Sequence, residues 1–424
     1  MTTPNKIFIL LLVFVISTFA YSQAPPANYD EDKIPDYELP DPLVLSSGKR
    51  VSDAKEWEEI QRPEILKKFA DHVYGRFPES TDIHFKVIET DSSAVGGKAI
   101  RKQVRVFFAT GLNSPKMDLL IYLPNKSGQP VPVFVGLNFC GNQCISTDEG
   151  INLTSSWVPN NEDHGFIDHK ATDVSRGLQS RRWPIEEIID RGYGLATVYY
   201  GDLEPDHPEG WKEGIRTTLQ ENLKIKPEEW SAMGAWAWGL SRIQDYLKQE
   251  PGADASQTIL TGHSRLGKAA LWAGANDERF AVIISNDSGE GGTALSRRIY
   301  GETIANLNTS FPYWFVSKYE EYNNKPEQLP VDQHMLLALM APRPLYVASA
   351  EDDQWADPKG EFLSALHAGE VYDLYQKKGI GQKDMPAVNQ PVGETIRYHI
   401  RTGKHDITDY DWKQFLDFAD KHLK

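Results

Sequence analysis

The sequence of 424 residues predicts an α/β fold, in which a mainly parallel sheet is covered by helices on both faces. Three observations support this prediction. Short, continuous apolar runs recur along the chain, and such runs are typical of strands that are buried on both faces. Segments with helical periodicity separate these runs. The chain also shows no internal repeat and no linker that would divide it into separate domains.

The expected elements follow one another along the chain. Strands are expected at residues 104–108, 117–123, 131–137, 193–199, 257–261, 281–285, 345–350 and 395–402. Helices are expected at residues 57–74, 230–247, 267–275 and 412–423. The last helix is amphipathic and ends the chain. Because most of these strands are continuously apolar and alternate with helices, the sheet is expected to be mainly parallel.

The N-terminus has the features of a secretory signal peptide. Lys6 precedes an apolar run at 7–16, and Ala20 and Ser22 form a small-x-small cleavage pattern. The apolar run is shorter than a membrane span requires. We therefore expect residues 1–22 to be a signal peptide that is cleaved near Ser22. The mature protein is expected in the periplasm or outside the cell, without a membrane partner.

The mature chain is expected to form one domain with two polar additions. Residues 23–50 are rich in proline and acidic residues and are expected to form an extended lead-in. Residues 51–424 are expected to form a single domain. Within it, residues 141–182 are polar and show little periodicity. A stretch of this length inside a compact domain indicates a functional surface insertion.

Charge and composition restrict the possible partners. The formal charge is −15, and loss of residues 1–22, which contain one lysine and no acidic residue, would change it to −16. No basic stripe stands out, so we expect no nucleic-acid partner. The 11 tryptophans and 18 tyrosines could form a sugar-binding surface, although ordinary packing explains most of them. We expect a monomer.

The only two cysteines, Cys140 and Cys144, lie four residues apart. Export would permit a disulfide between them, and two free thiols fit the sequence equally well. A zinc site would need further ligands, and no set of His or Cys residues is visible nearby. The sequence therefore leaves the disulfide and the free thiols open.

The strongest chemical signal lies at residues 259–268, where an apolar strand leads into Gly-His-Ser and then directly into a helix. This context is typical of the nucleophile elbow of the α/β-hydrolase fold, in which a tight turn lifts a serine hydroxyl above the sheet. The sequence therefore predicts an α/β-hydrolase fold with Ser264 as the nucleophile. The general pattern has glycine two residues after the serine, but here Leu266 fills that position and Gly267 follows one residue later.

A serine hydroxyl needs a base and an acid, and in this fold the three residues occur in the order serine, acid, histidine. His405 lies between the last predicted strand and the last helix, where this fold has its base. Asp353 follows the strand at 345–350, which is the usual place of the acid, and Asp287 follows the preceding strand. Either aspartate could orient the imidazole, or could be a helix-cap or turn residue. The sequence leaves both open, including a shared role.

These segments resemble a known family. GHSRLGK at 262–268 is similar to the G-x-S-R-x-G-K elbow of the glucuronoyl esterases, carbohydrate esterase family 15, in which the later glycine is the regular pattern. PVFVGLNF at 132–139, SGEGG at 288–292 and GKH at 403–405 also resemble segments of this family. The resemblance covers roughly residues 50–424.

The resemblance implies a reaction and a catalytic set. Members of the family cleave esters between 4-O-methyl-glucuronic acid on xylan and lignin alcohols, and they need no metal or organic cofactor. It implies that Ser264 is the nucleophile and His405 its base. The acid would be Asp287, where the family usually has Glu, or Asp353 after the next strand. Arg265 resembles the arginine that stabilises the oxyanion.

The resemblance also implies that Lys268, Glu302 and Trp355 contact the uronate ring. Their chemistry suits this role, because Lys268 and Glu302 can donate to and accept from sugar hydroxyls and Trp355 offers an apolar face. Lys268 lies one helical turn beyond Ser264, so that the two side chains can share a face. Alternatively, Lys268 and Glu302 could simply pair with each other at the surface.

Three other functions fit parts of the sequence. An acetyl xylan esterase, or another carbohydrate esterase, would use the same fold and the same catalytic residues without needing Lys268 or Trp355. A non-catalytic glycan-binding protein of this fold would be favoured by a missing catalytic residue, but serine, acid and histidine occur in the expected order. A metallohydrolase has the least support, because no His-x-His or H-E-x-x-H spacing occurs.

Overall fold

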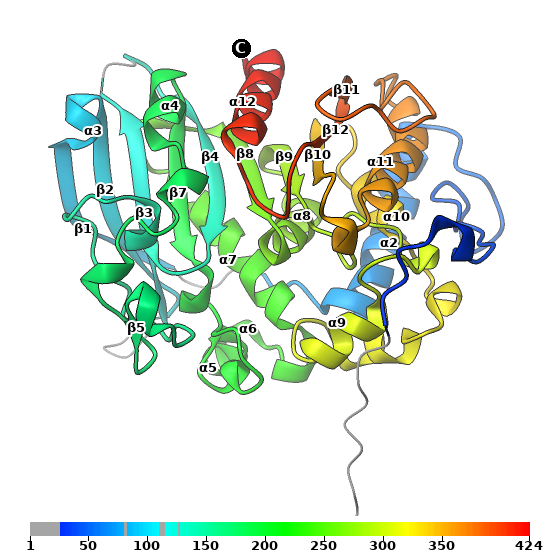
Figure 1. The fold of residues 1–424 in the computed structure, drawn as a ribbon, viewed down its shortest axis with the longest axis horizontal. Helices are drawn as coiled ribbons and strands as arrows, with labels where there is room; N and C mark the ends of the chain where they lie inside the picture. The colour runs from blue at the N-terminus through cyan, green and yellow to red at the C-terminus, as the bar shows by residue number, and fades with distance from the viewer. Residues whose placement is uncertain (1–25, 80–82, 110–114, 126–127) are drawn as a thin grey trace, which may run out of the picture.

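The computed structural model describes residues 26–79, 83–109, 115–125 and 128–424 (Figure 1). The predicted signal peptide at 1–22 lies outside the described residues. Within the described ranges, no helix combines the length and the apolar character that crossing a bilayer would require.

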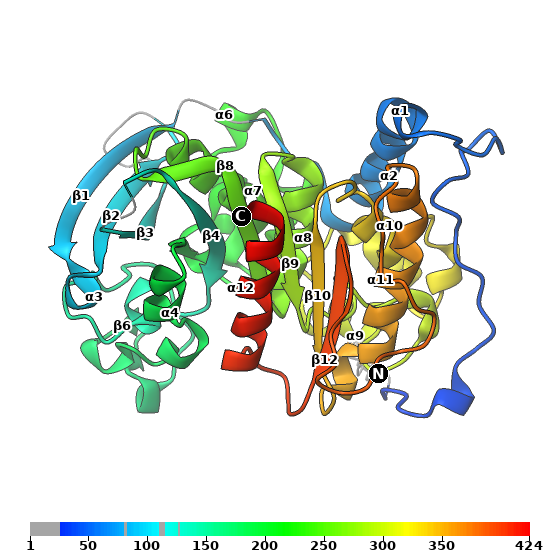
Figure 2. The ribbon, with the colours of Figure 1, turned by 90° about the horizontal axis from the view of Figure 1, so that it is seen from above.

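In the described part of the chain, ten strands form one sheet in the order β1-β2-β3-β7-β4-β8-β9-β10-β12-β11 (Figures 1 and 2). The strands are β1 His84–Ser93, β2 Ala99–Phe107, β3 Lys116–Pro124, β4 Val131–Asn138, β7 Gly194–Tyr199, β8 Ala253–His263, β9 Phe280–Asn286, β10 Leu345–Ala350, β11 Val392–Gly393 and β12 Ile396–Arg401. Every neighbouring pair from β7 to β12 is parallel, whereas β1, β2 and β3 form an antiparallel extension at one edge. The short β11 is antiparallel to β12 at the other edge.

The helices cover both faces of this sheet (Figure 2). The α-helices are α1 Ala54–Glu56, α2 Arg62–Phe69, α3 Ala94–Gly97, α4 Ile185–Asp190, α5 Ile215–Thr218, α6 Gln220–Leu223, α7 Ala232–Leu247, α8 Arg265–Asn276, α9 Ile304–Ser310, α10 Gln333–Ala338, α11 Pro358–Asp373 and α12 Asp409–Leu423. A π-helical turn at Trp57–Gln61 joins α1 to α2, and a second at Ala70–Tyr74 extends α2, so that residues 57–74 form one helical segment as expected.

The two apolar cores follow from the alternation of side chains along the buried strands. In β9, Ile283 belongs to the core under α7, α8, α10 and α11, whereas Val282 and Ile284 belong to the core under α4 and α12. The neighbouring strand alternates in the same way, with Leu260 in the first core and Ile259 in the second. The predicted α/β architecture, with a mainly parallel sheet covered on both faces, is confirmed.

The boundaries of several elements differ from those predicted. The helix expected at 230–247 begins at Ala232, because the Ser231 hydroxyl accepts the N–H of Gly234 at 3.1 Å and caps it. The helix expected at 267–275 begins two residues earlier, at Arg265. Strand β1 was not predicted from the sequence. It is an edge strand with mostly exposed side chains, so its sequence lacks a clear apolar alternation.

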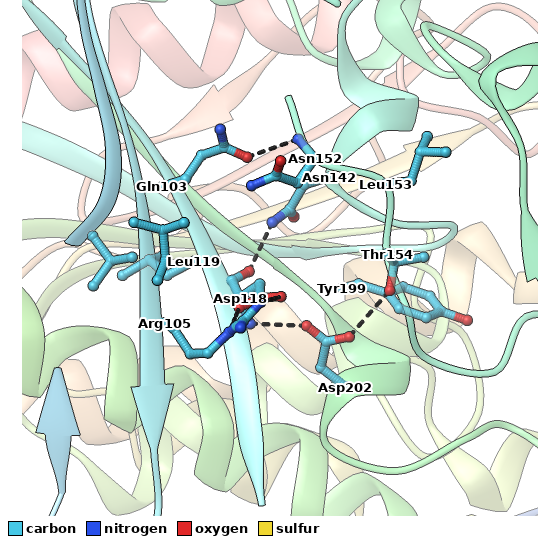
Figure 3. A pocket seen from close by; sticks show the side chains of 12 residues that line it. Gln103, Arg105, Asp118, Leu119, Asn142, Asn152, Leu153, Thr154, Tyr199 and Asp202 are labelled. Atoms are coloured by element: carbon cyan, nitrogen blue, oxygen red, sulfur yellow. Dashed lines mark hydrogen bonds and ion pairs between the residues drawn. The ribbon is translucent and has the colours of Figure 1, made fainter. Parts of the chain in front are cut away.

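The polar segment 141–182 forms short 3₁₀ turns and the two-stranded hairpin of β5 (Phe166–Ile167) and β6 (Lys170–Ala171). It packs against the outer strands through polar contacts. Gln103 accepts the Asn152 N–H at 2.8 Å, and the Thr154 hydroxyl donates to Asp202 at 3.3 Å (Figure 3). These contacts surround a small polar pocket that is lined by none of the predicted site residues. Directly after β4, Cys140 and Cys144 form a disulfide, with their Cα atoms 6.0 Å apart.

Candidate active site

Ser264 occupies the turn between β8 and α8. Its backbone has φ 57° and ψ −132°, a conformation that is uncommon for a residue with a side chain. The Ser264 N–H donates to the carbonyl of Asn286 at 2.9 Å, which ties the turn to the end of β9. The serine therefore lies at the carboxyl edge of the parallel strands, where the first turn of α8 has N–H groups that the helix does not use. The predicted strand–turn–helix geometry is present.

Two glycines make this turn possible. A Cβ atom on Gly262 would lie 2.1 Å from the Leu266 carbonyl oxygen, and one on Gly267 would lie 2.9 Å from the Ser285 hydroxyl. The side chain of Leu266 is only 1% exposed and belongs to the apolar core. The second small residue is therefore required at 267, where α8 passes close to β9, and not at 266. This close approach explains the displaced glycine of the sequence motif.

His405 is held by one of its two candidate acids. Its Nδ1 lies 2.6 Å from Oδ2 of Asp353, and the side chains are 41% and 6% exposed, respectively. The ring of His405 also lies 4.6 Å from that of His263, which brings the imidazole to the elbow. Among the described residues, Ser264 and His405 share no hydrogen bond. In free enzymes this bond is often long and forms only when substrate is bound.

The loop that carries His405 is wrapped around the guanidinium of Arg401. Arg401 donates to the carbonyls of Lys404 at 3.1 Å and Asp406 at 2.5 Å, so it contacts the backbone on both sides of the histidine. Its Nε donates to Asp411, in the first turn of α12, at 2.7 Å. The buried ion pair thus fixes the loop between the end of β12 and the start of α12. Sequence reasoning missed Arg401, whose only signal was a charged residue at the end of a buried strand.

Asp287, the other candidate acid, is buried beside the Arg401–Asp411 ion pair. Its Oδ2 accepts a long hydrogen bond of 3.4 Å from Arg401, and its Oδ1 has no hydrogen-bond partner among the described residues. Burial, followed by the nearby carboxylates of Glu361 and Asp353, raises the pKa of Asp287 well above its ordinary value. The direct hydrogen bond to His405 belongs to Asp353.

Among the described residues, Asp287, Asp353 and His405 have the spacing that a metal ion would require. One ligand atom each from Asp287, Asp353 and His405 lies within 4.8 Å of the others. Nδ1 of His405 is already hydrogen-bonded to Asp353. Acid–base chemistry accounts for this pair without a metal, because a carboxylate at Nδ1 leaves Nε2 of the imidazole as the proton acceptor.

Arg265 lies at the first position of α8, next to Ser264. Its guanidinium stacks over the Trp314 ring at 4.7 Å and pairs with the buried carboxylate of Asp206. Asp206 also accepts the hydroxyl groups of Tyr200 and Tyr313, each at 2.9 Å, and the indole N–H of Trp314 at 2.7 Å. Burial lowers the pKa of Arg265, but Asp206, Tyr200 and Tyr313 together outweigh burial and leave the pKa above its ordinary value.

Asp206 was not predicted from the sequence. It lies in an irregular loop after β7, and no spacing pattern relates it to Arg265, which lies 59 residues further along the chain. The available signal was the run of polar and aromatic residues after a buried strand, since parallel strands present their following loops at one edge. The structure makes Asp206 the residue that anchors Arg265 beside the elbow.

The three residues predicted to bind a sugar ring lie together. Nζ of Lys268 is 3.2 Å from Oε2 of Glu302, and these side chains are 5% and 10% exposed. The backbone N–H of Glu302 donates to the carbonyl of Trp355 at 2.8 Å, and Trp355 itself is 42% exposed. Lys268 and Glu302 therefore do pair, but inside the protein, one helical turn from Ser264, and not on the open surface.

These parts match the requirements of acyl transfer. A hydroxyl nucleophile needs a nearby base, the base needs an orienting acid, and the oxyanion needs donors fixed in advance. The elbow supplies Ser264, the adjacent loops supply the His405–Asp353 pair, and Arg265 lies at the helix N-terminus. The buried Lys268–Glu302 pair adds polar groups suited to a hydroxylated ring.

Comparisons with known proteins identify esterases that are similar to this chain. A family model described as fungal glucuronyl esterase matches residues 222–376. A carbohydrate esterase from an unknown prokaryotic organism is 46% identical over 98% of this chain and 98% of its own length. The 4-O-methyl-glucuronoyl methylesterase of Schizophyllum commune is 38% identical over 79% of this chain and 73% of its own. The solved glucuronoyl esterase from Solibacter usitatus superimposes with a TM-score of 0.88, at 50% identity, over 93% of this chain and 100% of that one.

Replacing Gly262 with alanine is expected to disrupt the elbow, because the added Cβ would lie 2.1 Å from the Leu266 carbonyl. We expect Gly262→Ala to lower the thermal unfolding midpoint, or to prevent soluble expression. Gly369→Ala in α11 is the matched control, since nothing lies within 4 Å of the Cβ that it would add. In a helix interior this change is favourable by about 1 kcal/mol. Circular dichroism would measure both midpoints, and parent-like unfolding of Gly262→Ala would contradict the close approach.

Proposed function

Because this chain belongs to the glucuronoyl esterases of carbohydrate esterase family 15, we propose that it hydrolyses esters of 4-O-methyl-glucuronic acid with lignin alcohols, on glucuronoxylan, through an acyl-enzyme at Ser264. One observation carries the proposal. The His405–Asp353 pair and the buried Lys268–Glu302 pair meet at the same nucleophile elbow. The first pair serves ester cleavage in general, and the second suits a sugar acid.

The proposed reaction uses groups of the chain and water. His405 accepts the proton of Ser264 while Oγ bonds to the ester carbonyl carbon, and Asp353 orients the imidazole and stabilises its cation. Arg265 and the first N–H groups of α8 stabilise the oxyanion. His405 then gives its proton to the departing alcohol oxygen. A water oxygen then bonds to the acyl carbon while His405 accepts the water proton. The bond from the acyl carbon to Oγ breaks, the uronate is released, and His405 returns the proton to Ser264 Oγ.

The buried ion pair supports a uronate in preference to an acetyl group. Charged donors and acceptors form stronger hydrogen bonds than neutral ones, and sugar hydroxyls can bond both Lys268 and Glu302. An acetyl group offers no hydroxyl, so these groups would add nothing to its binding. The exposed face of Trp355 can cover the apolar side of the ring. An acetyl xylan esterase, the main alternative, would have no use for the three residues.

The proposal also covers the place of action. We propose that residues 1–22 direct export and that the mature protein acts as a monomer in the periplasm or outside the cell. Its substrate, a polymer-bound ester, is too large to enter a cell unaided. The net negative charge disfavours nucleic acid as a partner.

The substrate class can be tested with kcat/KM for benzyl glucuronate, benzyl galacturonate and nitrophenyl acetate. We expect the parent to prefer benzyl glucuronate. Ser264→Ala should lose several orders of magnitude on all three esters, since it removes the nucleophile. Lys268→Met should lose activity on the glucuronate ester much more than on the acetate, because it removes the proposed contact to the ring and the ion pair with Glu302 but leaves the nucleophile and its base in place. Lys413→Met, which changes an exposed lysine of α12, is the matched control.

The outcomes separate two parts of the proposal. A parent that favours the acetate, or a Lys268→Met variant that loses all three activities equally, would leave a serine esterase without the glucuronoyl assignment. Activity of Ser264→Ala within about tenfold of the parent would refute the serine mechanism, because loss of such a nucleophile costs far more.

The contact at His405 distinguishes the two candidate acids. We expect Asp353→Asn to lower kcat by about 10⁴-fold, because an amide at Nδ1 favours the wrong imidazole tautomer. Asp287→Asn should reduce kcat by less than about tenfold, since the hydrogen bond to His405 Nδ1 is made by Asp353 and not by Asp287. The double variant should match Asp353→Asn. Partial activity in each single variant would instead indicate a shared role, and the reverse order would make Asp287 the acid.

Asp206 is expected to act through Arg265. Asp206→Asn should lower kcat by about 10²-fold, the size of effect seen when an oxyanion donor is lost, with little change in KM. Arg265→Ala should have a similar effect, and the double variant should be little worse than Arg265→Ala alone. Tyr313→Phe, which removes one donor to Asp206 and keeps the ion pair, is the control. Additive losses in the double variant would assign Asp206 a separate structural role.

A further inference from the structure

The described part of the N-terminal lead-in is fixed on the protein by specific contacts. The Asn28 carbonyl accepts the N–H of Gly301 at 2.8 Å. Glu31 pairs with Arg298 at 2.7 Å and with Lys359 at 2.6 Å. Burial opposes ionisation of Glu31, but Lys359 and Arg298 lower its pKa below the ordinary value. Ends of chains are usually poorly ordered unless they are tied down, so this docking identifies a segment with a defined position.

The lead-in is docked beside the residues proposed to bind the uronate. Gly301, which bonds to Asn28, directly precedes Glu302. A Cβ on Gly301 would lie 2.4 Å from the Trp355 carbonyl and 2.5 Å from that of Gln354, so these backbones are in close contact. Figure 1 shows the dark-blue lead-in passing near α9, which begins just after this segment. The lead-in therefore packs against the segment that carries Glu302, which contacts the backbone of Trp355 in the proposed sugar site.

Side chains from these segments form a row of successive contacts that begins at Trp355 and ends at Tyr29 of the lead-in. Trp355 is 42% exposed and Tyr29 is 53% exposed, and both are among the large apolar side chains that reach solvent. Tyr300 lies between them: its hydroxyl donates to Gln354 Oε1 at 2.6 Å, and its ring meets that of Tyr29 edge-on at 6.0 Å. Gln354 is itself fixed, since its amide donates to the Glu351 carbonyl at 2.7 Å. We refer to Trp355, Gln354, Tyr300 and Tyr29 as the rim row.

We propose that the rim row is an accessory subsite for the neutral xylan backbone that carries the uronate, with Tyr29 of the lead-in as its outer contact. The inference rests on the proposed function. The uronate presents its ester to Ser264 and its ring to Lys268 and Glu302. The glycosidic bond joins the uronate to xylan through a different carbon of the ring from the one that carries the ester. The polymer therefore leaves the site beyond the residues that hold the ring, where the rim row begins.

The chemistry of the rim row fits a chain of neutral pentoses. Sugar rings have apolar faces and a belt of hydroxyls. Tyr29 and Trp355 offer partly exposed aromatic surface, and Gln354 offers amide groups held in place between them. The acidic residues next to Tyr29, namely Asp30, Glu31 and Asp32, would repel a polyuronate but not a neutral chain. Continuity with the proposed ring site favours the sugar side of the substrate over the alcohol side.

Two benzyl esters with the same leaving group test the proposal. One is benzyl glucuronate, and the other carries the same benzyl uronate on xylotriose. With Tyr29→Ala in the full chain, we expect KM for the xylotriose ester to rise about five- to tenfold, the loss expected for one aromatic contact. kcat should not change, and the loss should be confined to the extended substrate. Tyr29→Phe should behave like the parent, because it keeps the ring.

Tyr37→Ala is the matched control, since Tyr37 belongs to the same lead-in but lies outside the rim row. The KM of this variant for the xylotriose ester should equal that of the parent. As a second measurement, calorimetry with Ser264→Ala would compare the binding of the glucuronosyl xylotriose acid with and without Tyr29→Ala. The same five- to tenfold loss of affinity is expected.

The outcomes are distinct. An unchanged KM for the xylotriose ester in Tyr29→Ala would overturn the subsite, as would an equal loss on both esters. A loss that appears only when benzyl is replaced by a larger lignin-like alcohol would assign the rim row to the alcohol side and refute the proposal. If the parent hydrolysed neither glucuronate ester, the proposed function itself would fail, which the parent measurements show before any variant is compared.

Discussion

The active site depends on one residue at the end of β9, Asn286. Its backbone carbonyl accepts the Ser264 N–H at 2.9 Å and holds the serine in its uncommon conformation. Its side-chain amide donates to the Asp406 carbonyl at 2.9 Å, in the loop that carries His405. The nucleophile and its proposed base lie 141 residues apart in the sequence. A single buried residue therefore contacts both segments, through its backbone carbonyl at the turn of Ser264 and through its side-chain amide at the loop of His405.

Burial also raises the pKa values of several acidic side chains in the protein. Desolvation raises the pKa of Glu361 to about 7 and that of Glu290 to about 8. Asp287 is shifted in the same direction, in part by the carboxylates of Glu361 and Asp353. Raised pKa values lower the cost of packing these acids together, because the neutral carboxyl is easier to bury than the carboxylate. Asp353 differs from these acids because its carboxylate contacts the imidazole of His405 directly, at 2.6 Å.

The sequence could predict the parts of this arrangement that are local. The strand, the turn and the helix at 259–268 are contiguous, so their pattern indicated both the fold and the position of Ser264. The displaced glycine looked like a departure from the general pattern until the contact of Gly267 with Ser285 gave its physical reason. Asp353 and Asp287 could not be separated from the sequence, because each follows one of two adjacent parallel strands. Only the 2.6 Å contact with His405 distinguishes them.

The residues that sequence reasoning missed act through tertiary contacts, and Asp206 shows why such contacts matter. A guanidinium has five N–H donors, and in Arg265 one of its terminal nitrogens is held by Asp206. Nε of Arg265 is buried without a hydrogen-bond partner among the described residues. An unpaired buried donor is costly in the free protein, and an oxyanion that forms within its reach would remove that cost. Asp206, fixed by two tyrosines and a tryptophan, keeps the cation from turning toward other acceptors. In the oxyanion role proposed for Arg265, the donors would be oriented before the charge develops, which is the condition for strong stabilisation of an oxyanion.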